Sequence, residues 1–300
     1  MTQPPVPRVS PIHGPDQYIL PTRAEGAATE AYRQTQFMLG DDLALFAEAM
    51  SLQLRLVKES YPSQYRTHSL AAIMGLWSRA YVYLSDTLLL VTRGSYPSTL
   101  PLFRAACETI AAEEGLRAAE MQEHAHWLDA TLVPNETFKA FEFHLGRYFA
   151  GGVIAHDEVL GPIYRPSSDL GRPAFGATLL QVAPESNNNR IAIDFAGASF
   201  HLGWAELALG WLLALSGRQL RVIVDASASS AGPAATMTPA IFAVSGESRA
   251  ACEDIQRRID AALARPDRCR LDEVDDHGNR RYLVVNFRRN NGAVPKKVLL

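Results

Sequence analysis

The chain contains few cysteines and none that are paired in sequence. Only three occur in its 300 residues, Cys107, Cys252 and Cys269, and none belongs to a C-x-x-C motif. A disulfide framework or a zinc knuckle is therefore not expected. The first 20 residues carry prolines and polar side chains where a secretory signal would have a basic and then an apolar segment. These features predict a protein of the reducing cytoplasm.

Several familiar motifs are also absent. The chain has no Walker loop, no G-x-G-x-x-G, no G-x-S-x-G elbow and no H-E-x-x-H, which removes most common enzyme classes. Its net charge of -3 provides no global field for a polyanion or an anionic membrane, so such a partner would need a local patch. The most apolar stretch, residues 200–215, is shorter than a membrane span of about 20 residues. It predicts a buried core helix and no membrane partner.

Helical periodicity dominates the rest of the chain and predicts a mainly α fold. Apolar residues recur at three- and four-residue steps in several segments between residues 43 and 215, while residues 151–198 break this pattern. The expected helices cover residues 43–57, 69–93, 102–116 with a possible extension to 128, 136–150 and 199–215. Short connections between them favour antiparallel neighbours. We expect a helical bundle over residues 36–225, preceded by a flexible, proline-containing arm at residues 1–35.

Two segments are expected to depart from the bundle. Residues 177–182 and 190–195 look like two short strands, which predicts a small β-hairpin insertion. Residues 226–239 are rich in Ala, Ser, Gly, Thr and Pro and predict a linker. Beyond it, residues 240–300 predict a small α/β module of βαββ type, with a strand at 241–244, a helix at 247–263, and a hairpin of strands 270–274 and 282–287.

Four charged residues stand at positions that the helical pattern would bury: Asp86, Arg104, Glu108 and Glu206. Arg104 and Glu108 are four residues apart on one helix face and can pair, and Asp86 could reach the same arginine. Buried charges are usually paired, so one interpretation is a structural network. The other interpretation is a binding pocket with shifted pKa values. The sequence leaves both open.

Histidines suggest two further sites. Glu123 and His126 have the Glu-x-x-His spacing of di-iron bundles, but no second copy exists in the chain. His156 and Asp157 form a His-Asp pair, as in metal-dependent HD-type phosphohydrolases. In that alternative, His126 or His144 supplies the first metal ligand and Asp194 or Asp225 the last, and the metal activates a water molecule.

A third pattern pairs an arginine with a histidine on one helix. Arg117 and His124 have the R-x(4-6)-H spacing of HEPN ribonucleases, in which arginine steadies a phosphate and histidine handles a proton. Residues 86–114, with Arg104 and Glu108, resemble uncharacterised helical families related to HEPN proteins. Ala118 stands where those families usually have a polar residue. The resemblance implies a helical bundle that acts as an RNA-associated or partner-binding component of a stress or defence system.

The C-terminal 21 residues contain no acidic residue. Their arginines and the aromatic residues between them could follow a phosphate backbone or bind an acidic protein. The binding residues so predicted are Arg280, Arg281, Arg288 and Arg289. Acidic residues at 272–276 could instead neutralise this charge. RNA or a protein is thus the expected partner, and the apolar helix at 200–215 could also face a second subunit. Whether the protein uses a cofactor is unknown from the sequence. A non-catalytic helical scaffold stays a third alternative.

Overall fold

The computed structural model is described for most of the chain. The described residues are 17–18, 20, 26–60, 68–117, 151–186, 193, 198–227, 230–231, 237–238, 244–276, 279–290 and 298–299. The predicted helix at 136–150 lies outside these residues.

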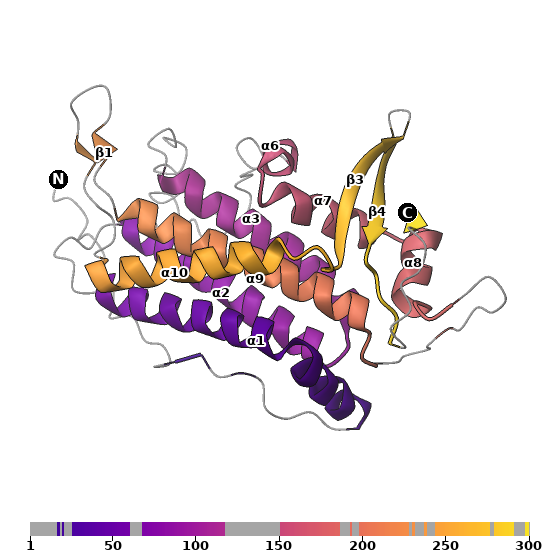
Figure 1. The fold of residues 1–300 in the computed structure, drawn as a ribbon. Coiled ribbons are helices and arrows are strands. Elements are labelled where there is room, and N and C mark those ends of the chain that lie inside the picture. Colours follow the sequence, from indigo (N-terminus) through magenta and orange to yellow (C-terminus); the bar gives the residue numbers. More distant parts are fainter. Residues whose placement is uncertain are drawn as a thin grey trace, which may run out of the picture.

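Long helices form the body of the molecule, and shorter helices and strands lie towards its two ends (Figure 1). The helices are α1 (Ala27–Ser60), α2 (His68–Thr92), the 3-10 helix η1 (Tyr96–Ser98), α3 (Thr99–Arg117), α6 (Gly151–His156), α7 (Gly161–Leu170), α8 (Phe175–Val182), α9 (Leu202–Ala226) and α10 (Gly246–Leu263). The strands are β1 (Ser230–Ala231), β2 (Met237–Thr238), β3 (Arg270–Asp276), β4 (Asn279–Val285) and β5 (Val298–Leu299). The predicted mainly α fold with a small C-terminal β module is confirmed.

Helix α9 is the centre of the core, as its sequence predicts. It is apolar nearly all round and contacts α1, α2, α3 and α10. Among the described residues it is the one helix long and apolar enough to cross a membrane, and most of that stretch is buried inside the protein. The predicted cap is wrong by two residues, because His201 rather than Ser199 caps this helix and accepts from the backbone N–H of Trp204.

The N-terminal helix is longer than its sequence pattern suggests. It begins at Ala27, so residues 27–35 are helical and do not belong to a flexible arm. Non-helical backbone angles at Leu39 kink it, immediately before Gly40. The prediction placed the helix start after this glycine, because glycine commonly marks a helix end. Burial of Ala31 and Thr35 against the rest of the protein explains why the helix extends further back.

The predicted β-hairpin insertion is wrong for its first strand. Residues 177–182 lie in α8, where the hydroxyl of Thr178 donates to the carbonyl of Ala174 one turn earlier. A short apolar run has no period that separates a strand from a buried helix, so contacts outside the run decide. In the proposed second strand, Ile193 is described and has no strand pairing. Helices α6, α7 and α8 lie between residues 151 and 182, where no helix was expected.

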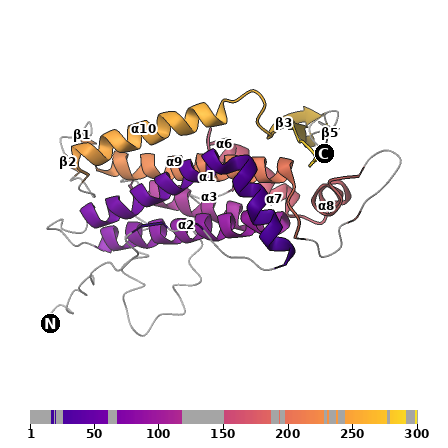
Figure 2. The same cartoon turned by 60° about the horizontal axis from the view of Figure 1, so that its bottom comes forward.

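The C-terminal residues add a helix and a small sheet to the bundle. Helix α10 lies over α9 and α1 (Figure 2). Strands β3 and β4 pair antiparallel from Arg270 with Val285 to Asp276 with Asn279, and β5 extends the sheet in the order β3-β4-β5. The predicted first strand is not seen at Val244, which is irregular. Within the predicted linker, β1 pairs with β2. One apolar core includes residues on both sides of that linker, with Leu209 before it and Ile259 and Phe287 after it.

Candidate functional site

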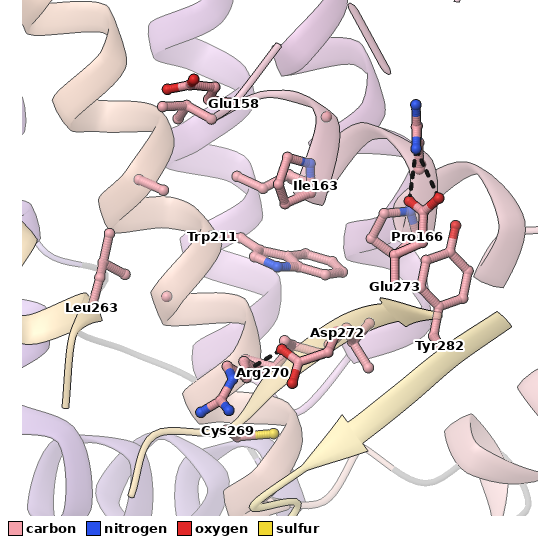
Figure 3. A pocket seen from close by; sticks show the side chains of 18 of the residues that line it. Glu158, Ile163, Pro166, Trp211, Leu263, Cys269, Arg270, Asp272, Glu273 and Tyr282 are labelled. Carbon is pink, nitrogen blue, oxygen red and sulfur yellow. Dashed lines mark hydrogen bonds and ion pairs between the residues drawn. The ribbon is translucent and has the colours of Figure 1, made fainter. Parts of the chain in front are cut away.

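A pocket of about 700 Å³ lies where the bundle meets the C-terminal hairpin. Its walls come from the turn before α7, from α7 itself, from the middle of α9 and from β3. Figure 3 shows these elements surrounding the space. Apolar side chains form much of the wall: Val159, Ile163, Pro166, Leu207, Trp211 and Leu271. The pocket therefore offers an apolar interior with charged groups at selected points.

Trp211 is the largest side chain in the pocket. It projects from α9 into the space between α7 and β3 (Figure 3). Its ring meets the edge of Phe103 on α3 at 5.0 Å between centroids, with an interplanar angle of 88°. This T-shaped contact, together with near-complete burial, holds the indole in place. The pocket thus has a rigid aromatic surface on its α9 side.

An ion pair closes the pocket on the hairpin side. Nη1 of Arg165 on α7 lies 2.8 and 2.9 Å from the two carboxylate oxygens of Glu273 on β3. Next to it, the hydroxyl of Tyr282 donates to Asp169 over 2.6 Å. Burial raises the pKa of Tyr282, and the neighbouring carboxylate of Asp169 raises it further. These contacts fix the hairpin against α7, and the shape of the pocket depends on them.

Arg268 is a buried cation in the wall of the pocket. Its side chain is only 4% exposed, and this burial lowers its pKa. Nη1 lies 3.0 Å from Oδ2 of Asp42, while Arg265 donates to the same oxygen over 3.1 Å. Within the described residues, Nε of Arg268 has no hydrogen-bond partner. The carboxylate of Asp42 therefore pairs with two guanidinium groups, and the Nε–H group of Arg268 has no acceptor within the described residues.

Gly210 lies directly beside this free N–H. A Cβ atom at this position would lie 3.0 Å from Nε of Arg268. Because glycine has no side chain, the guanidinium group of Arg268 can pack directly against the backbone of α9 at this turn.

The predicted metal ligand Asp157 has other partners. Its Oδ1 accepts from the backbone N–H groups of Val159 and Leu160, and its Oδ2 lies 3.0 Å from Nη2 of Arg218. The same nitrogen donates to Glu114 over 2.8 Å. His156 ends α6, and the proposed first ligand, His126, lies outside the described residues. Within the described residues no group of three or more His, Cys, Asp or Glu could hold a metal ion.

The four charges predicted to be buried differ in the structure. Asp86 is exposed, the side chains of Arg104 and Glu108 are 50% and 41% exposed, and only Glu206 is buried. The pairing prediction is confirmed for Arg104 and Glu108, whose Nε and Oε1 are 3.0 Å apart. Their burial was mispredicted because both lie at the edge of the apolar face of α3. Residue spacing alone cannot distinguish the edge of such a face from its centre.

The buried acid of α3 is Glu113, which sequence reasoning missed. It is fully buried and accepts from Nε2 of Gln219 on α9. Burial raises its pKa to about 8. The signal was present, since the three- and four-residue steps of Phe103, Ala106 and Ile110 continue to position 113.

The C-terminal arginines lie close to acceptors of this chain. Arg280 lies 3.3 Å from Asp169 and 3.5 Å from Glu273, Arg288 pairs with Glu206, and Arg289 donates to the carbonyl of Ser186. Arg281 is exposed and also has an interaction. These partners neutralise much of the positive charge that the sequence suggested, and phosphate binding there stays a prediction. Arg117 ends α3, whereas His124 lies outside the described residues.

The structure thus defines a helical bundle with an attached β-hairpin and a pocket at their junction. Comparison with protein-family models, curated proteins and solved structures found no match. Of the groups in the pocket, Trp211, Arg268 and Arg165 were not predicted as site residues. Trp211 belongs to a helix that is apolar all round, and the arginines have no distinguishing spacing, so only their position in the fold brings them together.

Proposed function

We propose that the protein binds a small organic molecule in the pocket between α7, α9 and β3. The observation that supports this function is the pocket itself, a space of about 700 Å³ with the indole of Trp211 in its wall. Ligand sites in proteins are usually concave spaces of roughly 300–1,000 Å³ that are mostly apolar with a few placed polar groups. The pocket has both properties.

The position of the pocket also supports a binding role. It lies between the bundle and the hairpin, and the Arg165–Glu273 ion pair joins the two across its edge. Binding sites commonly form where separate structural units meet, because neither unit alone fills the space between them. A ligand here would contact α7, α9 and β3 together and would stabilise the folded protein by mass action.

Tryptophan fluorescence tests this proposal directly. A library of small organic fragments is screened for compounds that raise the unfolding temperature, and each hit is titrated against the protein and against Trp211→Phe. We expect hits to change the emission of the native protein and to leave that of the variant largely unchanged, although Trp77, Trp127 and Trp204 still emit. A library without hits, or hits whose signal is unaffected by Trp211→Phe, would contradict the proposal.

An RNA-associated role in a stress or defence system is a second proposal, based on the HEPN-like resemblance. The ion pair of Arg104 with Glu108 favours it, because both side chains are about half exposed on α3 and Arg104 also lies over the ring of Tyr164, 5.7 Å from its centroid. An exposed guanidinium can bind a phosphate. Binding and cleavage of single-stranded RNA are measured with the native protein and Arg104→Glu; absence of both activities in the native protein overturns this proposal.

A further inference from the structure

We infer that the ligand of this pocket is an uncharged, mainly apolar organic molecule. The structure describes seven charged side chains in the pocket wall; six of them pair with an opposite charge of the protein, and the seventh is exposed to solvent. The inference rests on the proposed binding function and adds the chemical class of the ligand. Three features support it: the pairing of the arginines, the position of the remaining acids, and the buried apolar surface of the pocket.

Two arginines of the pocket wall pair with acids of the same wall. Nη1 of Arg165 lies 2.8 and 2.9 Å from the two carboxylate oxygens of Glu273. Nε of Arg270 lies 2.9 Å from Oδ1 of Asp272. Four of the seven charges therefore cancel in pairs at the hairpin side of the pocket. A ligand carboxylate would have to displace an existing partner before it could bind either guanidinium group, which removes most of its gain.

The third arginine, Arg268, belongs to a cluster with equal numbers of positive and negative charges. Burial lowers the pKa of Arg268, and the carboxylates of Asp42 and Glu206 oppose that shift. The linked charges of the cluster are three arginines and three acids: Arg265, Arg268, Arg288, Asp42, Glu206 and Asp267. Nε of Arg268 is buried and packs against the backbone at Gly210. Arg268 therefore offers a ligand neither an excess of positive charge nor an accessible donor there.

The two remaining charges are acids of the turn before α7, and neither provides a strong site for a cation. Asp157 accepts from two backbone N–H groups and lies 3.0 Å from Nη2 of Arg218. Glu158 has no charged partner in the described part of the chain, but it is exposed to solvent. Water and salt screen an exposed acid, so its attraction for a ligand ammonium group is weak.

The surface that a ligand would cover is apolar and buried. Leu207 and Trp211 on α9 are 2% and 8% exposed, and Ile163 on α7 is 2% exposed. Ile163 and the indole of Trp211 project into the same space from the two helices (Figure 3). A ligand against these side chains leaves water. A charged group on it would lose its hydration without gaining a counter-ion, whereas an uncharged apolar molecule gains from the burial of its surface.

Three probes with one apolar body test the charge of the ligand: 4-phenylbutanol, 4-phenylbutyrate and 4-phenylbutylamine, titrated calorimetrically at neutral pH. At this pH the acid is an anion and the amine is a cation. We expect the alcohol to bind about tenfold or more tightly than either charged probe, because a charged group loses far more hydration than a hydroxyl group. This comparison uses the unaltered protein, so it is decisive even if a variant fails to fold.

Glu273→Gln tests whether ion pairing sets this preference. The substitution removes the negative charge beside Arg165 and Arg280; Arg280 keeps Asp169 as a partner, whereas Arg165 keeps no carboxylate within the described residues. We expect 4-phenylbutyrate to bind this variant about fivefold or more tightly than the native protein, and 4-phenylbutanol to change much less. Glu253→Gln is the matched control, because it removes an exposed acid of α10 that is not among the lining residues of the pocket.

The outcomes separate the inference from the proposed function. Tightest binding of the alcohol, with a gain for the acid in Glu273→Gln and none in Glu253→Gln, supports the inference. A charged probe that binds as tightly as the alcohol and changes Trp211 emission overturns the uncharged ligand and leaves small-molecule binding intact. Equal affinity of the acid for the native protein and Glu273→Gln also overturns the inference.

The fragment screen covers the case in which none of the three probes binds at millimolar concentration. Mostly uncharged compounds among its Trp211-dependent hits then support the inference, and mostly charged compounds overturn it while the proposed function stands. A screen without hits, together with three probes that do not bind, counts against both.

Discussion

The carboxyl group of Glu113 and the carboxamide of Gln219 face each other inside the bundle, with Nε2 of Gln219 2.5 Å from Oε2 of Glu113. Both residues are fully buried, and neither Oε1 of Glu113 nor Oε1 of Gln219 has a hydrogen-bond partner within the described residues. A protonated carboxyl group can both donate to and accept from a carboxamide, whereas a carboxylate can only accept. The neutral form of Glu113 therefore suits this site, in agreement with the pKa of about 8 that burial produces.

This pair predicts a dependence of stability on pH. Burial raises the pKa of Glu113 from 4.5 in the unfolded chain to about 8 in the folded protein. The folded state therefore holds a proton that the unfolded state loses, and the free energy of unfolding should fall as pH rises from about 4.5 to about 8. We expect Glu113→Gln, which stays neutral, to flatten this slope in urea unfolding measured at one-unit pH intervals.

The control for this prediction is Glu108→Gln, which removes a half-exposed acid from the same helix. It should leave the slope between pH 5 and pH 8 close to that of the native protein. Equal slopes in Glu113→Gln and the native protein would show that Glu113 is ionised in the core, contrary to the prediction.

Asp42→Asn should destabilise the fold strongly. The substitution removes the carboxylate that Arg265 and Arg268 share, and Arg268 would remain charged while 4% exposed. Removing one partner of a buried ion pair costs about 3–5 kcal/mol. Chemical denaturation measures the loss, with Glu48→Gln as control: Glu48 pairs with Arg258 on the surface, where loss of a pair costs at most about 1 kcal/mol. Similar values for the two variants would contradict the prediction.

Arg218→Gln should destabilise the protein more than Arg104→Gln. Arg218 on α9 joins Glu114 of α3 to Asp157 of the turn before α7, and its side chain is 23% exposed. Its loss leaves two acids without their common partner, which we expect to cost about 1–3 kcal/mol. Arg104 has one half-exposed partner on its own helix and should contribute about 0.5 kcal/mol or less. Thermal unfolding of the two variants at equal pH measures both losses of stability. A larger loss of stability in Arg104→Gln than in Arg218→Gln would refute the prediction.

Gly203→Ala should weaken the attachment of the C-terminal segment. A Cβ atom at position 203 would lie 2.8 Å from the ring of Phe287, which packs against α9. Overpacking of this kind costs about 1–3 kcal/mol. Gly75→Ala on α2 meets nothing within 4 Å and should stabilise its helix by roughly 0.5–1 kcal/mol. Denaturant midpoints of both variants test this contact, and a Gly203→Ala protein as stable as the native one would exclude it.

Long, strongly periodic segments of the fold could be predicted from the sequence. Helices α2 and α10 and the hairpin of β3 and β4 appear within a few residues of their expected bounds, whereas α9 was expected to end at residue 215 and continues to Ala226. Each combines a sustained apolar period with a terminal signal, such as Gly94, whose φ of +72° ends the turn after α2. The strand expected at 177–182 failed because its apolar run is too short to show a period.

The candidate site could be predicted only in part. The ion pair of Arg104 and Glu108 followed from their four-residue spacing on one helix. Arg268 and Asp42, by contrast, are more than 200 residues apart in sequence, and no local pattern relates them. Trp211 was correctly predicted to lie in the core helix. The pocket beside it, however, depends on the positions of α7 and β3 in the folded protein.

The periodicity of neighbouring residues was enough to predict the mainly helical class, the central place of α9 and the C-terminal hairpin. Tertiary structure alone decided which charges are buried, how they are paired and where the pocket opens. Burial and pairing depend on side chains brought together from distant parts of the chain, since desolvation and short-range electrostatics act through space and not along the sequence.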